Sequence, residues 1–365
     1  MKITRRLFLT SALLRADSAP EQVEVYRSGQ DGYFSYRIPS LLVTKHGALL
    51  AFCEGRKNSG HDTGDIDLLV KRSIDGGRTW GPPQVVADRG SDTVGNPCPV
   101  VDRASGAIWL ALTANPGNLN ETQIKALAPG GTRTVWMTRS DDDGLTWAPA
   151  AEITRDVKDP DWSWYATGPG IGIQLRNGRL VIPCDHWRTS TGASHSHVIY
   201  SDDRGRTWKL GGSAAEKTNE CQVAELSDGA LLLNMRSYAG RNRRAVALSL
   251  DGGATWLETH FDEALIEPVC QASLVRYPKK TRGRYWLLFS NPADVKRDRM
   301  TIRLSQDDGA TWLLSRLLFE GPAAYSSLAV LKDGEIGCLY ERRNPGETIT
   351  MARFSVQWLT GMVKT

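Results

Sequence analysis

Arginine is the side chain type best suited to grip an anion, and four of the arginines of this sequence lie in short phrases within or beside apolar runs. Arg37 occurs in YRIP, Arg56 in FCEGR, Arg236 in NMRS and Arg303 in TIRLS. A guanidinium can pair with a carboxylate through two parallel hydrogen bonds, and it stays charged at any working pH. Taken singly, an arginine on a strand is most often a surface ion pair of little consequence. A common role therefore depends on a fold that brings these phrases together.

The spacing of the residues does not indicate a metal site or a redox site. The six cysteines, at positions 53, 98, 184, 221, 270 and 338, lie in or beside apolar stretches, and none has CxxC spacing. An even count permits disulfides, but placement within strands favours buried free thiols. No His, Cys or acidic cluster has metal-ligand spacing, so we expect neither a metal nor a cofactor.

The composition is that of one soluble domain. The 365 residues are 41% hydrophobic and 24% charged, with a formal net charge of +4. This mild charge includes no basic run of the kind expected for nucleic acid, and no stretch in the body is apolar enough to span a bilayer. We therefore expect neither a nucleic-acid partner nor an integral membrane segment. The oligomeric state is left open.

One eight-residue phrase, Ser-x-Asp-x-Gly-x-Thr-Trp, occurs five times, starting at residues 73, 140, 201, 249 and 305. Its Asp can accept hydrogen bonds from backbone N–H groups, its Gly can take a positive φ, and its Ser and Thr can tie the loop to itself. The closing Trp is expected to bury a large ring beneath the turn. These Asp boxes are therefore predicted to be structural hairpin turns.

The segments between the boxes are typical of strands. Apolar runs of strand length are punctuated by Gly, and no segment beyond the N-terminus has a sustained helical period; examples lie at residues 40–55, 106–117, 178–187, 229–237 and 283–291. Short antiparallel strands with about one Trp-closed hairpin per unit predict an all-β fold, a β-propeller of about six blades. A β-sandwich is the alternative, which the regular hairpins make less favourable.

The N-terminus carries a pattern typical of export. Residues 4–10, TRRLFLT, resemble the bacterial twin-arginine motif, and an apolar stretch and small residues follow as far as Pro20. We therefore expect residues 1–20 to be a signal segment, residues 21–365 to be the catalytic propeller, and the protein to be exported, either to the periplasm or outside the cell. The apolar stretch is short and ends at Arg15.

YRIP followed by repeated Asp boxes resembles the exo-sialidase (neuraminidase) family, whose fold is a six-bladed propeller. The resemblance runs from about Val23 to the C-terminus through the phrases FCEGR, NPCP, ATGPG, NECQVAE, NMRS, AAYSS and CLYE. Sialic acid carries a carboxylate on its anomeric carbon. An enzyme that releases it must hold this anion and attack a carbon that negative charge shields.

The resemblance implies a role for each phrase. It places an arginine triad for the substrate carboxylate on Arg37, Arg236 and Arg303. It implies that Tyr325 in AAYSS is the nucleophile and Glu220 in NECQ its base; sialidases are a known exception to glycosidases that use two carboxylates. A tyrosine avoids the repulsion that a carboxylate would meet from the substrate, because it is neutral until a base takes its proton.

Further site residues follow from the same resemblance. Asp62 in the loop HDTGDID would be the general acid and base, whereas Asp67, within the apolar run IDLLVKRS, is interpreted as structural. Glu341 in CLYE would hold Arg37 through an ion pair. Glu54 and Arg56 are expected to line the site beside the triad. Asp185 and His186 in CDHW are expected to contact the glycerol tail or N-acyl group, although His186 fits a structural histidine equally well.

The sequence thus predicts an exo-α-sialidase that acts on sialylated glycans with retention of configuration. Two alternatives stay open. One is a sialoglycan-binding propeller without turnover, which the presence of Tyr325, Glu220 and Asp62 argues against. The other is a glycosidase for a related nonulosonic acid that lacks the N-acetyl group. Linkage preference, and hydrolysis as against transfer, are not indicated.

Overall fold

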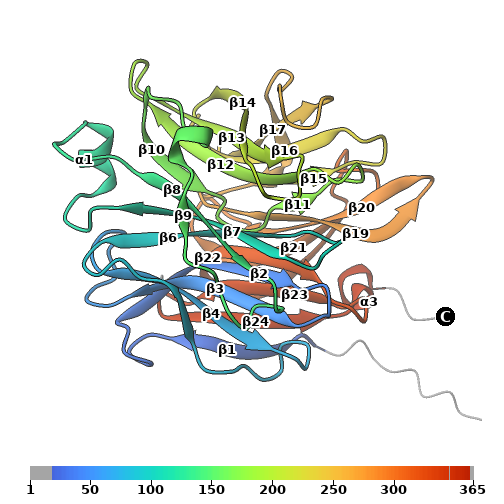
Figure 1. Ribbon diagram of the computed structural model, residues 1–365. Helices are drawn as coiled ribbons and strands as arrows, with labels where there is room; N and C mark the ends of the chain where they lie inside the picture. Colours follow the sequence, from blue (N-terminus) through green and yellow to red (C-terminus); the bar gives the residue numbers. More distant parts are fainter. Residues whose placement is uncertain (1–18, 345, 362–365) are drawn as a thin grey trace, which may run out of the picture.

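The computed structural model describes residues 19–344 and 346–361, and nearly all of their regular structure is β-strand (Figure 1). The described part holds only three short helices: α1 (Glu121–Lys125), α2 (Thr154–Val157) and α3 (Val356–Thr360). The all-β prediction is confirmed. The twin-arginine phrase and the apolar stretch after it lie outside the described residues. No described helix is long and apolar enough to cross a membrane.

The largest sheet has the order β2-β3-β4-β6-β7-β8-β9, with β5 paired to β4. A single parallel pair, Ile66 with Thr93, joins its two antiparallel halves. Its strands are β2 (Ser35–Val43), β3 (Leu49–Arg56), β4 (Ile66–Ser73), β5 (Gln84–Ala87), β6 (Thr93–Val101), β7 (Ile108–Asn115), β8 (Thr134–Ser140) and β9 (Ala151–Glu152).

Two smaller antiparallel sheets follow along the chain. One has the order β10-β12-β13-β14 with β11 paired to β12, and the other has the order β15-β16-β17-β18. Their strands are β10 (Trp162–Thr167), β11 (Ile173–Gln174), β12 (Leu180–Arg188), β13 (Ala193–Ser201), β14 (Lys209–Glu216), β15 (Thr218–Glu225), β16 (Leu231–Ser237), β17 (Arg243–Ser249) and β18 (His260–Ile266).

The last sheet joins the two ends of the described chain. Its order is β1-β24-β23-β22-β21-β20-β19, so the first strand lies beside the last one (Figure 1). The long strand β22 pairs with β21 along its first part and with β23 along its last part. The strands are β1 (Glu21–Arg27), β19 (Ser273–Thr281), β20 (Arg284–Pro292), β21 (Asp298–Ser305), β22 (Leu314–Val330), β23 (Ile336–Arg342) and β24 (Thr348–Phe354).

The Asp boxes form the turns that their residues predict. In the second box, the Asp142 carboxylate accepts hydrogen bonds from the Ser140 and Thr146 hydroxyls and from the backbone of Leu145 and Thr146. Gly144 takes a φ of 82°. The Ser–Asp and Thr–Asp bonds recur in the other four boxes.

The expectation for the closing tryptophans is only partly met. Trp208 is buried, whereas the tryptophans of the other four boxes are half-buried. Each box lies at the end of a hairpin, so part of its ring faces solvent. The Asp boxes therefore fix turns more than they fill the core.

Fully buried strands meet one another in the interior. Strand β2 contacts β6 and β22, β6 contacts β10, and β15 contacts β12 and β19. Strands β2, β6, β10 and β15 are buried along nearly their whole length, because both of their faces are covered. All six cysteines are buried and unpaired, as the sequence favoured. One end of these inner strands carries the polar cavity described next.

Candidate active site

A polar cavity of about 160 Å³ lies where the inner strands of all four sheets end. It gathers five arginines and five carboxylates from segments far apart in sequence. The lining residues are Arg37, Ile38, Glu54, Arg56, Asp62, Asn96, Glu121, Arg133, Trp164, Ala166, Asp185, Asn219, Glu220, Arg236, Tyr238, Arg297 and Tyr325. Among the described residues, no group of three or more His, Cys, Asp and Glu side chains is arranged to hold a metal ion.

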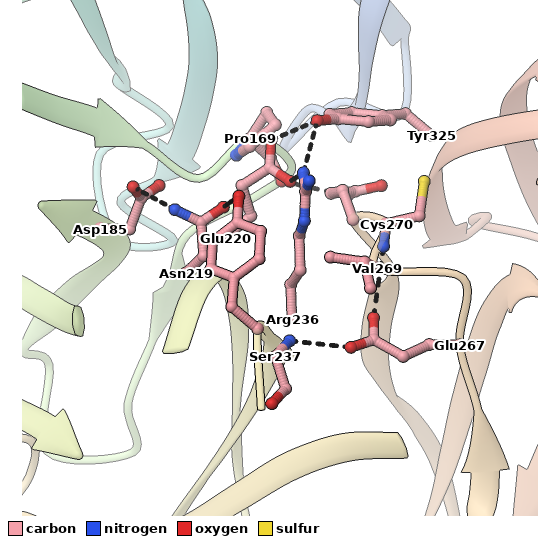
Figure 2. A network of polar contacts seen from close by, with 12 residues as sticks. Pro169, Asp185, Asn219, Glu220, Arg236, Ser237, Glu267, Val269, Cys270 and Tyr325 are labelled. Carbon is pink, nitrogen blue, oxygen red and sulfur yellow. Dashed lines mark hydrogen bonds and ion pairs between the residues drawn. The ribbon is translucent and has the colours of Figure 1, made fainter. Parts of the chain in front are cut away.

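Tyr325, Glu220 and Arg236 form a hydrogen-bonded unit at the cavity wall (Figure 2). The Tyr325 hydroxyl donates to Glu220 Oε1 at 2.6 Å. Arg236 Nη1 donates to Glu220 Oε2 at 2.7 Å and to the Tyr325 oxygen at 3.2 Å. All three side chains are largely buried. The phenol and the carboxylate that the sequence predicts as partners are thus hydrogen-bonded to each other.

Burial raises the pKa of Tyr325 well above its ordinary value, and the neighbouring charge of Glu220 raises it further. Arg236 and Arg37 oppose this shift by favouring the phenolate. The phenol is therefore neutral at physiological pH. Its proton already points at a carboxylate that can accept it.

Arg37 is held by Glu341, as predicted. Its Nε and Nη2 donate to the two carboxylate oxygens of Glu341 at 3.1 and 3.0 Å. The backbone N–H of Ile38 donates to the same carboxylate at 2.9 Å. Ile38 has a φ of 63°, rare for a β-branched residue, and the β2–β3 register shifts between Arg37 and Ser40. This bulge in YRIP turns Arg37 toward the cavity, where its guanidinium lies 5.2 Å from the Tyr325 ring centroid.

The arginine that joins Arg37 and Arg236 beside Tyr325 is Arg297, and the prediction of Arg303 for this place is wrong. Arg303 lies within β21, does not line the cavity, and donates to Asn291 Oδ1 at 2.9 Å. Arg297 directly precedes β21, and its guanidinium lies 5.7 Å from the Tyr325 ring centroid. Because β21 begins at Asp298 and runs away from the cavity, only the connection before it reaches the site. The sequence signal that could have identified Arg297 is its position in the loop before the strand, where binding residues are common.

Asp62 lies at the mouth of the cavity with its side chain 76% exposed. Its carboxylate pairs with Arg56 at 2.6 Å and approaches Arg37 to 3.5 Å. The surrounding protein removes part of the water from this exposed carboxylate, which raises its pKa, but the charges of Arg56 and Arg37 lower the pKa of Asp62 by more, so it lies below the ordinary value. Asp67 is buried and accepts a hydrogen bond from Tyr33 at 2.6 Å, which agrees with its structural interpretation.

Glu54 and Arg56 both line the cavity, as expected. Glu54 Oε2 accepts from Arg56 Nη2 at 2.8 Å, and its Oε1 accepts from the Asn96 backbone at 3.1 Å. Arg56 Nη1 also donates to the carbonyl of Gly60 at 2.7 Å. Arg56 thus links the floor of the cavity to the loop that carries Asp62.

Asp185 and His186 point to opposite faces of β12, because successive side chains alternate along a strand. Asp185 lines the cavity and accepts from Asn219 Nδ2 at 2.7 Å (Figure 2). Burial raises its pKa well above the ordinary value, and Glu220 adds to the shift. His186 does not line the cavity: its ring stacks on Trp162, with centroids 3.4 Å apart. The structural alternative for His186 is therefore the one observed.

Comparison with known proteins agrees with this arrangement. A family model described as a BNR repeat-like domain matches residues 47–338. The exo-alpha-sialidase of Aspergillus fumigatus is 31% identical over 90% of this chain and 86% of its own length. This chain belongs to the sialidase family. A sialidase of Bacteroides fragilis is 37% identical, and this chain spans only 62% of its length. The solved structure of the Hadza microbial sialidase Hz136 is 37% identical, with a TM-score of 0.86 over 93% of this chain and 69% of that one.

Several sialidase-cavity residues of this chain were not predicted from the sequence. The buried Arg133 stacks on Trp164 at 4.2 Å and donates to Asn96 Oδ1 at 2.7 Å. Tyr238 donates to Asn219 Oδ1 at 3.3 Å and lies beneath the guanidinium of Arg236. Arg133 directly precedes β8, Tyr238 directly follows β16 and Trp164 lies within β10, and none of these segments has a distinctive spacing. Only their meeting at one cavity in the fold identifies them as site residues.

Proposed function

We propose that this chain is an exo-α-sialidase that hydrolyses terminal sialic acids from glycans. The observation that carries the proposal is the Tyr325–Glu220–Arg236 unit, in which a buried neutral phenol donates to a carboxylate at 2.6 Å beside a guanidinium. Tyr325 is the nucleophile, Glu220 takes its proton, and Arg236 stabilises the charge that passes between them.

The grip on the substrate carboxylate comes from Arg37, Arg236 and Arg297. All three line the cavity, and they surround the ring of Tyr325. Glu341 holds the fork of Arg37 in place before substrate arrives, so binding does not require this side chain to be ordered. This arrangement supports placing the anomeric carbon next to the phenol oxygen.

Asp62 is the general acid. In the free protein it is held ionised by Arg56 and Arg37. When the substrate carboxylate takes Arg37 as its partner, Asp62 loses part of this stabilisation and its pKa rises toward the range where it carries a proton. It then donates that proton to the leaving oxygen as Tyr325 attacks the anomeric carbon.

The product retains its configuration because two displacements occur at the same carbon. Tyr325 first forms a covalent sialosyl intermediate and the aglycone departs. Water then attacks the same face that the aglycone left, with Asp62 as base, and Glu220 returns the proton to the phenol oxygen. The substrates are sialylated glycoconjugates.

We further propose that the four sheets divide into six blades of a propeller. The large sheet separates at the single pair between β4 and β6, and the last sheet separates within β22, which gives six groups. The inner strands contact one another in the cycle β2, β6, β10, then β12 and β15, β19, β22 and back to β2. Residues 21–365 would form this domain, preceded by a signal segment for export at residues 1–20.

Release of sialic acid from a fluorogenic α-sialoside tests the activity, and proton NMR of the first product formed tests its stereochemistry. The wild-type protein should release the α anomer first, and this signal should convert slowly to β. A β anomer as the first product would contradict a covalent intermediate. Binding without release would favour a sialoglycan-binding protein.

A further inference from the structure

Phe34 is the most exposed of the Phe, Tyr and Trp residues in the described part of the chain, with 57% of its surface accessible. It belongs to none of the buried apolar clusters. The neighbouring Tyr33 and Tyr36 are buried and pack against each other with ring centroids 5.7 Å apart. The local packing therefore does not depend on Phe34.

Backbone hydrogen bonds on both sides fix the position of residue 34. The Phe34 N–H donates to the carbonyl of Arg56 at 2.9 Å, and its own carbonyl accepts from Gly29 at 3.2 Å. The ring edge lies 4.0 Å from the position that a Cβ on Gly60 would take. Because Asp62 is only two residues beyond Gly60, the phenyl ring flanks the loop that carries the proposed acid.

We propose that Phe34 is a specificity-determining residue that binds the leaving sugar, the residue to which sialic acid is attached. This inference rests on the proposed function. Asp62 must contact the glycosidic oxygen, and it lies at the mouth of a cavity of about 160 Å³. The sugar beyond that oxygen therefore lies outside the cavity on the Asp62 side, where Phe34 is exposed.

The chemistry of the contact is that of a sugar against an aromatic ring. A pyranose presents apolar C–H groups on one face, and packing them on an exposed phenyl removes apolar surface of both partners from water. The contact needs no charge. It therefore favours substrates whose aglycone is a sugar over those whose leaving group is too short to reach the ring.

Two substrates that differ only in the leaving group test the proposal. The kcat/KM of Phe34→Ala should fall about tenfold for sialyllactose and stay within about twofold of wild type for methyl α-sialoside. Phe34→Tyr should restore the value for sialyllactose. Leu145→Ala is the matched control, because Leu145 is also 57% exposed but lies in an Asp box. An equal loss on both substrates, or no loss on either, would overturn the proposal.

A binding measurement separates this inference from the proposed activity. In a Tyr325→Phe background, saturation-transfer NMR with sialyllactose should show contact to both the sialic acid and the lactose protons. Adding Phe34→Ala should remove the lactose signals and keep the sialic acid signals. Unchanged lactose signals would reject the role of Phe34. A wild-type protein that releases sialic acid from neither substrate would reject the proposed function, while this binding comparison would still decide the role of Phe34.

Discussion

Each member of the Tyr325–Glu220–Arg236 unit sets the state of the next one. Arg236 donates to both partners, and burial keeps the phenol between them neutral. Burial lowers the pKa of Arg236, but the charge of Glu220 raises it by more, so the guanidinium stays charged. The phenol oxygen and the Glu220 oxygen are 2.6 Å apart, so a proton can move from Tyr325 to Glu220 without a change in the net charge of the unit.

Arg297 and Arg303 form a matched pair for testing the anion grip. Arg297→Lys should keep the charge but lose the planar fork, lowering kcat/KM about tenfold or more, which corresponds to about 1.4 kcal/mol of transition-state binding. Arg303→Lys should change kcat/KM by less than about twofold, because Arg303 contacts Asn291 and not the cavity. Steady-state kinetics on one sialoside would measure both. A larger loss for Arg303→Lys would contradict the placement of the third arginine.

Asp62 is tested through the leaving group. Asp62→Asn removes the proposed acid, so kcat/KM for sialyllactose should fall by about 10² to 10⁴. An aryl sialoside should lose much less, because its phenol leaves without full protonation. Parallel assays of the two substrates give this comparison. A fall of equal size on both would assign Asp62 to the pairing with Arg56 and not to proton transfer.

Most of the cavity residues could be predicted from the sequence phrases that contain them. The prediction was wrong where a phrase contains several side chains of the same type. The segment from Lys296 to Arg303 contains three arginines, and their residue type cannot distinguish the connection from the strand. What separates them is the start of β21 at Asp298. The prediction that His186 contacts the substrate was wrong for a similar reason. Side chains alternate along a strand, so only one of the neighbours Asp185 and His186 can face the cavity.

Among the elements, the Asp boxes are turns whose carboxylates are fixed by local hydrogen bonds. The Asp203 carboxylate accepts from the Thr207 backbone and from the Thr207 and Ser201 hydroxyls, and these bonds lower its pKa to about 2. The same pattern lowers the pKa of Asp251 to about 2. Each box lies at the end of a hairpin, away from the cavity lining.

Asp203→Ala should therefore lower stability without lowering the activity of the folded protein. The loss should be about 1 to 3 kcal/mol at pH 7. The folded pKa of about 2 lies below the unfolded value of about 3.9, so the contribution is present above pH 3.9 and lost as the pH falls toward 2. Unfolding midpoints at pH 7 and pH 3 should show a smaller gap between variant and wild type in acid. A variant with full stability and no activity would show that the box does more than form a turn.

Strands β12 and β13 hold a buried cluster of three histidines. His186 Nδ1 lies 3.1 Å from His197 Nδ1, and His195 stacks on His186 with centroids 5.2 Å apart. Burial lowers the pKa of His197 to about 3, and it also lowers the pKa of His186 below its ordinary value. The rings of His186 and His197 are buried, so charging either of them would leave a cation without water.

Wild-type stability should consequently fall as the pH falls from about 6.5 to 4.5. In this range His186 and His197 bind protons in the unfolded chain and not in the folded one, which gives up to about 1.4 kcal/mol per pH unit for each of the two. His197→Gln should flatten this slope by up to one such contribution. Urea unfolding across the range measures it. An unchanged slope would show that His197 is protonated in the folded state.

At the scale of the whole molecule, the inner strands place side chains from all four sheets at one cavity. The all-β architecture was predictable because the boxes and apolar runs repeat along the chain. The convergence of Arg133, Trp164 and Tyr238 was not, because it depends on which strand ends meet. Sequence patterns specify local turns and strand faces, whereas long-range neighbours follow from how the sheets pack.

Identification of the residue that forms the covalent intermediate tests the central claim most directly. A fluorinated sialosyl fluoride, which reacts quickly and is released slowly, should trap the wild-type protein as an adduct. Mass spectrometry of the digested protein should find the added sialosyl mass on the peptide that contains Tyr325. Tyr325→Phe should fold, bind the sugar and give no adduct. An adduct on any other residue, or turnover at the wild-type rate by Tyr325→Phe, would contradict the account.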